Sequence, residues 1–178
     1  MRIGLISDTH IPEFGPKLPE AAYRALAGVD LVLHGGDLHV IDVLDWLEQR
    51  IGAPVYCARG NGDTGYNGRP RVPDDPRLKP AHVLTVEGVR IGMAHAVPLP
   101  DECPWIPIER TMKRIFGGPV DVIVHGDTHV EQVEWHKGVL LVNPGSPTFP
   151  HNLVGVPGHV ALLEVRDGKA HAEIVPLG

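Results

Sequence analysis

The stretch RIGLISDTH, residues 2–10, is a short apolar run that passes directly into Asp8-Thr9-His10. Such a run, bounded by polar residues, is typical of a buried strand that ends in a loop. Two later stretches have the same form, VDLVLHGGD at residues 29–37 and VDVIVHGD at residues 120–127. Each again ends in an aspartate, so the sequence predicts three buried strands with an acidic residue directly after each of them.

The segments between the first strands have helical spacing. Residues 18–28 contain Pro19 where a first helical turn accepts proline, and Gly28 ends the pattern. Apolar residues recur three and four apart from Val40 to Ile51, and residues 54–58 follow as a further strand. Alternation of strand and helix implies right-handed crossovers and therefore a parallel sheet.

The second half of the chain predicts antiparallel pairing. Three pairs of apolar runs flank two-residue turns that end in glycine: residues 83–86 with 89–94, 132–135 with 139–142, and 160–165 with 170–175. One helix is expected at residues 108–116, before a strand at residues 120–125. Together these elements predict an α/β fold of two packed sheets with helices outside them.

Composition and charge exclude several classes of protein. With 178 residues, of which 43% are hydrophobic and 21% charged, the chain is predicted to form a single domain over residues 1–178. A formal net charge of −6 gives no overall attraction for a nucleic-acid backbone. No apolar run reaches the ~18 residues of a membrane helix, and Asp8 comes too early for a signal peptide, which predicts a cytoplasmic protein. Cys57 and Cys103 are expected to be ordinary thiols.

Three Asp-x-His triplets stand at the ends of predicted strands, at Asp8-Thr9-His10, Asp37-Leu38-His39 and Asp127-Thr128-His129. In an open parallel sheet, the loops beyond the carboxyl ends of the strands share one crevice. Asn61, in a glycine-rich loop, and His95, at the end of a later strand, are expected to join them. The sequence therefore predicts one cluster, which consists of Asp8, His10, Asp37, Asn61, His95, Asp127 and His129.

Such a cluster is electrostatically unfavourable without a cation, because crowded carboxylates raise one another's pKa. Divalent metals reverse that effect and suit mixed oxygen and imidazole ligands. The ligands suffice for two ions, which at ~3.5–4 Å apart can share a bridging water whose pKa falls toward ~7 and which, as hydroxide, can attack phosphorus. The alternative interpretation is that these side chains only cap helices and satisfy turns, which accounts for the Asp and Asn residues but not for the histidines.

At these positions the sequence resembles the calcineurin-like metallophosphoesterases, and within them the small single-domain prokaryotic phosphodiesterases. The resemblance covers about residues 1–175. It rests on five motifs in order, with one further shared stretch: Asp8-x-His10, Gly36-Asp37, Gly60-Asn61-x-Asp63, His95 and Gly126-x-Thr128-His129, then Asn143-Pro144-Gly145-Ser146. It implies a four-layer αββα sandwich of two mixed β-sheets flanked by helices, with a dinuclear metal site.

The resemblance also implies a role for each residue of the cluster. Asp8, His10 and His129 would hold one metal, Asn61 and His95 would hold the other, and Asp37 would bridge both. The residues at the catalytic centre would be Asp37, Asn61 and His95. The expected cofactors are two divalent ions, with manganese first and nickel, zinc, iron and magnesium as alternatives.

One departure from the family pattern concerns a metal ligand. The family has Gly-His-x-His where this chain has Gly126-Asp127-Thr128-His129, so a carboxylate replaces an imidazole of the second metal. Asp127 lowers the positive charge of the site by one unit. We expect a second site that prefers a harder ion such as Mn²⁺, or that fills poorly because the Asp side chain is short.

The other departure is Gly62, where many relatives have a histidine that can protonate the leaving group. Glycine has no proton to donate. Unless His34, His39 or His125 replaces that function, the expected substrates are phosphodiesters or activated esters, whose leaving groups need little protonation.

Several other residues are expected to lie near the predicted cluster and to support it. Asp63 is expected either in a structural turn or beneath the ligands, with a direct role as the alternative, and His34, His39 and His125 are expected either to support ligands or to pack as polar residues. Residues 143–146 are expected in a turn that supports the site, and Arg59 as a cation facing the phosphate. Proline-rich loops are expected at residues 65–80 and 96–107, where Tyr66 and Trp105 could flank the substrate. Five histidines are expected at the surface and three tryptophans in the core or under loops: His82, His136, His151, His159 and His171, and Trp46, Trp105 and Trp135.

Together these patterns predict a metal-dependent phosphoesterase, with a phosphodiesterase preferred over a monoesterase. Its substrate would be a small phosphate ester, nucleotide-derived esters among the candidates, and relatives suggest a homodimer. Two other classes remain open. The fold also resembles that of the retromer subunit of vacuolar sorting, whose metal site is altered and whose surface binds partners, so a non-catalytic interaction protein is the alternative. A different metal hydrolase, such as an amidohydrolase, is the third interpretation.

Overall fold

The computed structural model of the chain describes residues 1–65 and 68–178. The first half contains β1 (Arg2–Ile6), α1 (Glu20–Ala25), β2 (Leu31–His34), α2 (Asp42–Ile51), β3 (Val55–Ala58) and β4 (Leu78–Lys79). The second half contains β5 (Ala81–Val86), β6 (Val89–Ala94), α3 (Ile108–Phe116), β7 (Val122–Val124), β8 (Gln132–His136), β9 (Val139–Asn143), the 3-10 turn η2 (Pro150–Asn152), β10 (His159–Arg166) and β11 (Lys169–Pro176).

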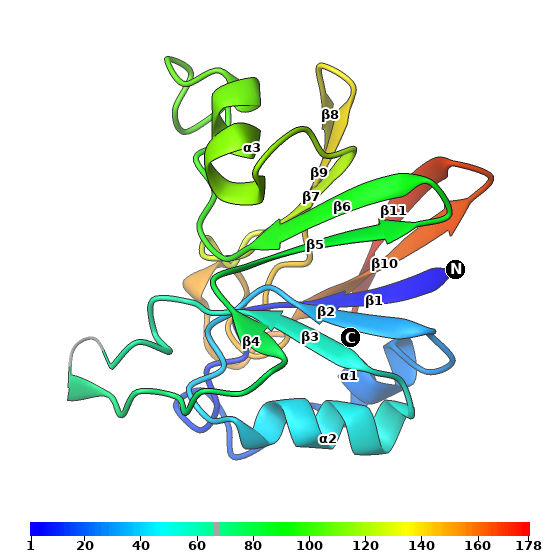
Figure 1. Cartoon of the computed structure of the whole chain (residues 1–178). Coiled ribbons are helices and arrows are strands. Elements are labelled where there is room, and N and C mark those ends of the chain that lie inside the picture. Colours follow the sequence, from blue (N-terminus) through cyan, green and yellow to red (C-terminus); the bar gives the residue numbers. More distant parts are fainter. Residues whose placement is uncertain (66–67) are drawn as a thin grey trace.

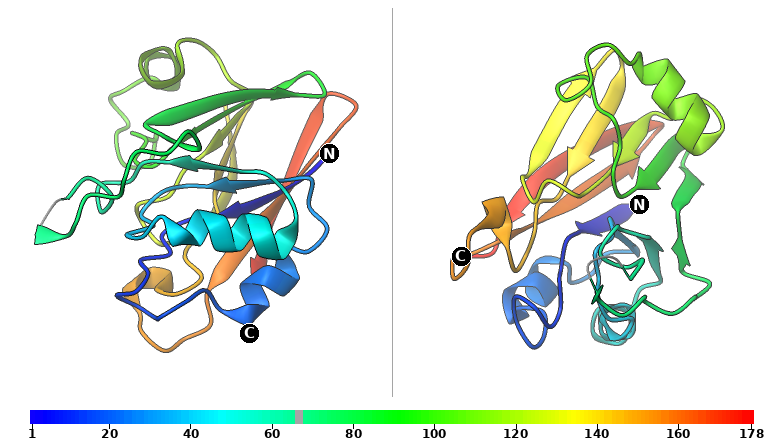
Figure 2. Two further views of the ribbon diagram at one scale, coloured as in Figure 1. Left: turned by 60° about the horizontal axis from the view of Figure 1, so that its bottom comes forward. Right: turned by 90° about the vertical axis from the view of Figure 1, so that its left-hand side faces the viewer.

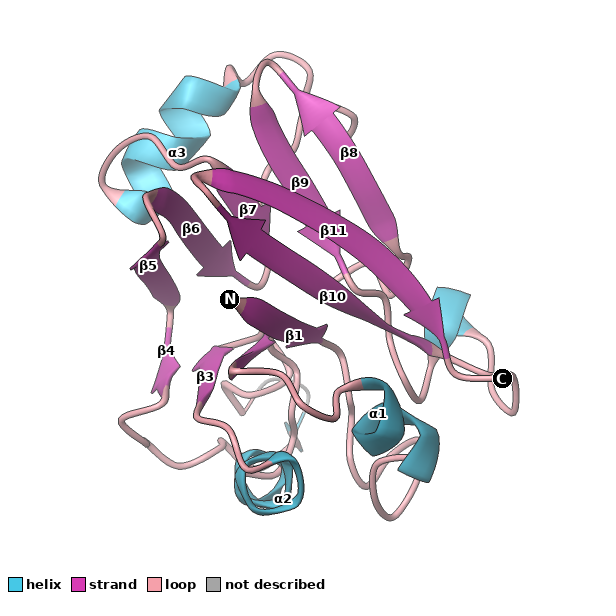
Figure 3. Ribbon diagram, turned by 90° about the vertical axis from the view of Figure 1, so that its right-hand side faces the viewer, coloured by secondary structure: helices cyan, strands magenta, loops and turns pink. Residues whose placement is uncertain are grey.

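Two mixed sheets pack face to face (Figure 1). The first has the strand order β11-β10-β1-β2-β3-β4, with β1 to β4 parallel and β10 antiparallel to β1. The second has the order β5-β6-β7-β9-β8, with β6, β7 and β9 parallel. Helices α1 and α2 cover the outer face of the first sheet, and α3 covers that of the second (Figure 3). The predicted four-layer αββα sandwich is confirmed.

The apolar residues of each strand alternate between two cores, as the period of two in a strand requires. In β2, Leu31 and Leu33 belong to the core between the sheets, whereas Val32 packs toward the helices. Helix α3 buries Met112 and Phe116 against the second sheet, since residues four apart share a helical face. The sheets are therefore fixed on both faces, which holds the loops at their ends in place.

Several predicted elements are shorter in the structure. Helix α1 begins only at Glu20 because Pro19 has an extended ψ of 139°, and it ends before Leu26. The predicted strand at residues 120–125 is reduced to β7. The sequence did not indicate β4, whose two residues pair with β3 but are too few to show a period. In the described part of the chain, none of the helices has the length and apolar character to cross a bilayer.

The prediction for the aromatic residues is wrong at three positions. Trp105 is 74% exposed and Trp135 is 60% exposed, so neither is a core residue. His82 is not at the surface but buried, with Nε2 at 2.9 Å from the Cys57 carbonyl and 3.1 Å from the Arg77 carbonyl. Trp46 packs against the core on the helix side of the first sheet, as predicted.

Candidate metal centre

The loops that follow β1, β2, β3, β6 and β7 meet at one edge of the sandwich, which faces the viewer in the right-hand view of Figure 2. All seven residues of the predicted cluster lie in these loops. Parallel strands place their carboxyl ends together, and the two sheets present theirs at the same edge (Figure 1). The topology thus brings segments from distant parts of the sequence to one place.

The three Asp-x-His triplets share one backbone conformation. Both the aspartate and the histidine of each triplet have a positive φ: 53° and 44° at Asp8 and His10, 57° and 67° at Asp37 and His39, and 74° and 61° at Asp127 and His129. A left-handed conformation costs ~1–2 kcal/mol for a residue with a Cβ. Such strained residues cluster at functional sites, where the surrounding structure maintains them. The repetition at all three triplets shows that the backbone is shaped around their side chains.

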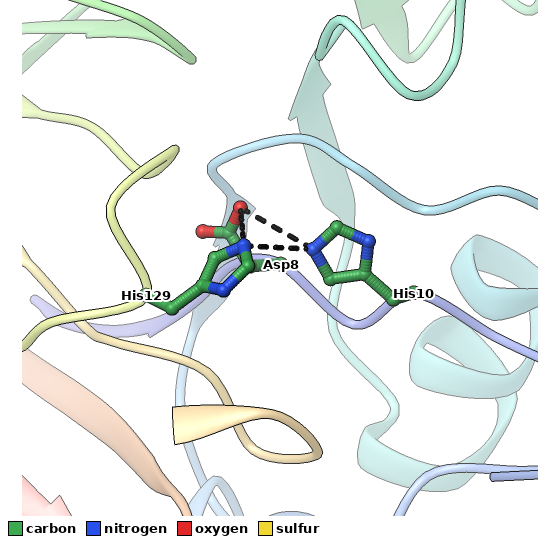
Figure 4. A group of neighbouring side chains, drawn as sticks. All are labelled: Asp8, His10 and His129. Carbon is green, nitrogen blue, oxygen red and sulfur yellow. Dashed lines mark hydrogen bonds and ion pairs between the residues drawn. The ribbon is translucent and has the colours of Figure 1, made fainter. Parts of the chain in front are cut away.

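The first group of side chains is Asp8, His10 and His129 (Figure 4). The Nε2 atoms of the two histidines lie 3.0 Å apart. The Oδ1 atom of Asp8 lies 3.8 Å from Nε2 of His10 and 3.6 Å from Nε2 of His129. All three residues are buried, with Asp8 completely inaccessible. The group contains two imidazole nitrogens and a carboxylate oxygen, which are ligands that divalent transition metals accept.

The second group is centred on His95. Its Nε2 lies 3.1 Å from Asn61 Oδ1, 3.4 Å from Asp37 Oδ1 and 3.5 Å from Asp127 Oδ1. Asp8, Asp37 and His95 also have ligand atoms close enough together to hold one ion. Asn61 and Asp127 are the exposed members of this group, with 49% of the Asp127 side chain accessible.

Asp37 lies between the two groups. Its Oδ1 faces His95, and its Oδ2 lies 3.8 Å from Nε2 of His10, which belongs to the first group. One carboxylate therefore presents an oxygen to each side. This is the arrangement that a bridging carboxylate needs.

The tautomer of His95 is fixed by the backbone. Its Nδ1 lies 2.9 Å from the carbonyl oxygen of Gly35 and therefore carries the hydrogen that it donates. In the neutral ring, Nε2 then has its lone pair directed at three oxygens, two of which belong to carboxylates that can only accept. A set of lone pairs that face one another requires a cation between them, or a proton on Nε2.

The pKa values of Asp8 and His95 also indicate that the site requires positive charge beside its carboxylates. Burial raises the pKa of Asp8 to about 7, against the opposing charge of His95. Burial lowers the pKa of His95, but contact with Asp127 and the charges of Asp8 and Asp37 outweigh it and raise that pKa to about 9. The site therefore favours added positive charge beside its carboxylates. A divalent ion supplies that charge, so the residues present fit the metal that this cluster predicts.

His10 is held in its neutral form, which is the form that can bind a metal ion. Burial and the neighbouring imidazoles of His39 and His129 lower its pKa to about 2. Its Nδ1 lies 2.9 Å from Nε2 of His39, so a hydrogen on Nδ1 donates to His39 and leaves Nε2 free. A hydrogen-bonded partner of this kind orients a ligating imidazole and fixes its tautomer.

The chain of contacts continues outward from His39. Its Nδ1 lies 3.4 Å from Glu13 Oε2, and the guanidinium of Arg69 donates to both oxygens of Glu13 at 2.8 and 3.1 Å. The sequence had left His39 open between supporting a ligand and simple polar packing. The structure places it in support of His10, and the contribution of Glu13 and Arg69 carried no sequence signal.

Asp63 is a structural residue. Its Oδ1 accepts the backbone N–H groups of Leu38 and His39, and its Oδ2 accepts those of Asp37 and Gly60, all within 3.0 Å. Burial raises its pKa, although the bonds from His39 and Gly60 oppose that rise. The side chain therefore ties the loop after β2 to the loop after β3 and holds Asp37 in its left-handed conformation.

The stretch at residues 143–146 supports the cluster, as predicted. Asn143 donates from Nδ2 to the carbonyl of Gly126 at 3.1 Å and to Thr128 Oγ1 at 3.0 Å. Ser146 donates from Oγ to the carbonyl of Asp8 at 2.7 Å. These bonds connect the loops after β9, β7 and β1 and leave the side chains of the predicted ligands free.

Two phenylalanines cover the first group of ligands. The rings of Phe14 and Phe149 are stacked with centroids 3.7 Å apart. The ring of Phe14 meets that of His10 edge-on at 5.8 Å, and Phe149 meets His129 at 5.3 Å. Neither residue was expected at the site, because their spacing in the sequence is too large for any local pattern to connect them.

Arg59, predicted to face the phosphate, lines the pocket beside Asn61 and His95 and also has several partners within the protein. Its guanidinium donates to the carbonyls of Asp63, Val72 and Pro73 and to the carboxylate of Asp74. These partners fix the position of the guanidinium, and a contact between Arg59 and a phosphate stays a prediction. Tyr66, the other loop residue named beside the site, lies outside the described residues.

The three histidines that could replace a general acid at Gly62 all have partners within the protein. His34 is fully buried, with its ring nitrogens at Thr9 Oγ1 and the amide of Gly36. The Nε2 of His125 lies 3.2 Å from Gln132 Oε1. His39 contacts His10, and its ring fills the space beside Gly62, where an added Cβ would lie 2.5 Å from Nε2.

A pocket of about 580 Å³ opens beside the second group. Asn61, His95 and Asp127 form one part of its wall, and apolar residues such as Val97 and Ile115 form another. This volume and mixed lining are typical of sites for small organic ligands. The pocket joins the candidate metal centre to space for an organic group.

The αββα layers and the carboxylate and imidazole cluster are together typical of metal-dependent hydrolases. A family model, the calcineurin-like phosphoesterase superfamily domain, matches residues 1–168. A probable metallophosphoesterase of Methanothermobacter thermautotrophicus is 34% identical over 180 residues, which cover 100% of this chain and 94% of the relative. The chain therefore belongs to the calcineurin-like phosphoesterase superfamily, as its motifs predicted.

Two solved structures show the same fold. Vps29 of Entamoeba histolytica in complex with zinc gives a TM-score of 0.70 at 20% identity, with 100% of both chains covered. An archaeal phosphodiesterase gives a TM-score of 0.64 at 18% identity, with 98% of this chain and 100% of the other covered. Sequence identities this low show the architecture alone.

Proposed function

We propose that this protein is a phosphodiesterase that uses two divalent metal ions, manganese first among them. The observation that carries the proposal is the position of Asp37, whose two oxygens face His10 on one side and His95 on the other. When bound, a pair of divalent ions supplies Lewis acidity toward the phosphoryl oxygens and an activated water as nucleophile. Small phosphate esters are the substrates that this family implies.

The residues have separate tasks in this proposal. Asp8, His10 and His129 hold one ion, while Asn61, His95 and Asp127 hold the other, with Asp37 shared between them. His95 offers Nε2 because Gly35 engages its Nδ1, and His10 offers Nε2 because His39 engages its Nδ1. The phosphate group would be bound where Asn61, His95 and Asp127 meet the pocket.

The pocket favours a substrate with two substituents on phosphorus. The group that leaves and the group that stays both need room, and about 580 Å³ beside the second group of ligands provides it. Because Gly62 offers no proton and the nearby histidines are engaged, the leaving group has to depart with little protonation. Both features favour diesters and activated esters over alkyl monoesters.

An assay with Mn²⁺-loaded protein tests the proposal. We expect bis(p-nitrophenyl) phosphate to be cleaved with a higher kcat/KM than p-nitrophenyl phosphate, and glycerol phosphate to be the poorest of the three. Parallel assays with Ni²⁺, Zn²⁺, Fe²⁺ and Mg²⁺ rank the metals. Equal efficiency on the diester and on glycerol phosphate would contradict the proposal.

Asp127 is expected to make the binding of the second ion weaker than that of the first. The Asp127 side chain is shorter than the imidazole that it replaces and is 49% exposed, so its carboxylate reaches less far toward the second ion. Metal analysis of dialysed protein should therefore find one tightly held ion per chain and a second that is lost more readily, and Asp127→Ala should lose the second altogether. Two tightly bound ions per chain that persist in Asp127→Ala would disprove this expectation.

His39 is proposed to position His10. Replacing it with alanine removes the acceptor for the Nδ1 hydrogen of His10, and we expect the affinity for Mn²⁺ to fall by ~10–100-fold. His39→Gln, whose side-chain oxygen can accept the same bond, should recover part of that affinity, and His171→Ala, at an exposed position, should change nothing. Unchanged Mn²⁺ binding in His39→Ala, measured by titration, would exclude this role.

We also propose that residues 1–178 act as one domain. The core between the sheets contains Leu5 and Leu33 from the first half of the chain together with Val122 and Leu163 from the second. Neither half can bury its sheet alone. Thermal unfolding followed by circular dichroism and by activity should therefore give a single coincident transition.

A non-catalytic interaction protein is the second candidate. Val133 and Trp135 are exposed on β8, an edge strand of the second sheet, at 40% and 60% of their surface. Exposed apolar side chains on an edge strand suit contact with another protein. Metal-loaded protein that cleaves neither ester while retaining its ions would favour this candidate over the phosphodiesterase.

A further inference from the structure

A second set of metal-ligating side chains lies outside the candidate centre. Glu131, His151 and His159 each offer one ligand atom, and these atoms lie within 4.8 Å of one another. Glu131 Oε2 is 2.7 Å from His151 Nε2 and 3.6 Å from His159 Nδ1. None of the three residues contributes to the two groups of ligands described above, so the cluster is a separate feature.

The three residues come from segments that the backbone already holds. Glu131 follows the loop of His129, His151 is in η2, and His159 begins β10; η2 lies beside the start of that strand (orange in Figure 2). The amide of His151 donates to the carbonyl of His129 at 3.0 Å, and the amide of His159 donates to the carbonyl of Ser146 at 3.0 Å. The cluster therefore does not depend on a flexible surface loop.

The two distances between Glu131 and the histidines are close to those of a zinc site. Zinc bonds of ~2.0–2.1 Å to nitrogen and oxygen in a tetrahedron place the ligand atoms ~3.3 Å apart. The two separations at Glu131, 2.7 and 3.6 Å, lie on either side of that value. Two imidazoles and one carboxylate form a ligand set that zinc uses, with the fourth position left to water.

The unsatisfied nitrogen of His159 is an independent observation. Its Nδ1 is buried and has no hydrogen-bond partner among the described residues, since the nearest carboxylate oxygen is 3.6 Å away. A buried nitrogen without a partner costs free energy, and an ion bound there would satisfy it. Side-chain exposures of 28%, 46% and 19% for Glu131, His151 and His159 leave a path from solvent.

We infer that Glu131, His151 and His159 form an outer metal site for a zinc-type divalent ion. An ion there would join η2 and the start of β10 to the segment two residues after His129. It would therefore stabilise the loop that carries His129, and it would not itself take part in the hydrolysis. The inference does not depend on the proposed phosphodiesterase function.

Zinc binding in a variant without the central ligands tests the inference. In Asp8→Asn/Asp37→Asn protein, equilibrium dialysis should find one zinc ion per chain, and Co²⁺ in its place should give the intense visible absorption of four-coordinate cobalt. Adding His151→Ala and His159→Ala to this background should lower the zinc affinity by more than ~100-fold. Loss of a residue that only hydrogen-bonds to a metal ligand already lowers metal affinity by up to ~100-fold, and these substitutions remove two ligands themselves. Zinc should also raise the Tm of the background protein and not that of the quadruple variant.

His171→Ala on the same background is the matched control and should leave the zinc ion in place. Glu131→Gln keeps the shape of the side chain and should weaken zinc binding without unfolding the protein. If the Asp8→Asn/Asp37→Asn protein does not fold, ion counts in otherwise wild-type protein with and without the two alanine substitutions give the same comparison. Zinc binding that is absent from the background, or that is unaffected by both Glu131→Gln and the alanine pair, would overturn the inference.

Discussion

Asp63→Ala is expected to lower the free energy of unfolding by about 4 kcal/mol or more. The carboxylate accepts four backbone N–H groups, three of them buried, from Asp37, Leu38 and Gly60, and one partly buried, from His39. Each donor left without a partner costs ~1–3 kcal/mol. Urea denaturation of metal-free protein measures the change directly, without a contribution from bound ions.

The same substitution is expected to reduce metal binding, because Asp63 holds the backbone of Asp37 in place. A Cβ at Gly60 would overlap Oδ1 of Asp37, so the two loops approach too closely to adjust around a lost contact. Asp101→Ala, at an exposed aspartate in another loop, is the control and should change stability by less than ~0.5 kcal/mol. A similarly small change in Asp63→Ala would refute the structural role.

Asp37→Asn is expected to reduce kcat/KM toward bis(p-nitrophenyl) phosphate by more than ~100-fold. Loss of a residue that only supports metal ligands already lowers metal affinity or activity by ~10–100-fold. Asp37 itself faces both groups of side chains, so its loss should have a larger effect. The amide nearly preserves the volume of the side chain but removes its charge and one acceptor oxygen. Stability should therefore change less than in Asp63→Ala.

The measurement is a comparison of steady-state kinetics at saturating Mn²⁺ for Asp37→Asn and for Asp101→Asn. The second variant makes the same chemical change at an exposed position and should retain wild-type activity. Activity within about threefold of wild type in Asp37→Asn would remove Asp37 from the proposed centre.

The sequence predicted the architecture because strand ends and hairpin turns are local signals. RIGLISDTH and its two counterparts each place an aspartate directly after a buried strand, and parallel strands gather their carboxyl ends. The structure brings all seven predicted residues to one edge of the sandwich. It also shows what the repeated triplets have in common, which is a left-handed backbone at the aspartate and the histidine of each.

The sequence could not predict contacts between residues that no local pattern connects. The path from His10 through His39 to Glu13 and Arg69 depends on how two loops and a third segment pack. His151 and His159 were expected to be surface residues, and only their shared contact with Glu131 distinguishes them. The partners of Arg59 carried no sequence signal, because three of them are backbone carbonyl groups and the fourth, Asp74, belongs to a distant part of the loop.

Crystals of the protein soaked in Mn²⁺ and measured at the manganese absorption edge test the central claim most directly. A pair of bound ions should give anomalous difference density among Asp8, His10, Asp37 and His129, with a second, weaker peak beside Asn61, His95 and Asp127. Crystals at saturating Mn²⁺ without anomalous density at either position would contradict it.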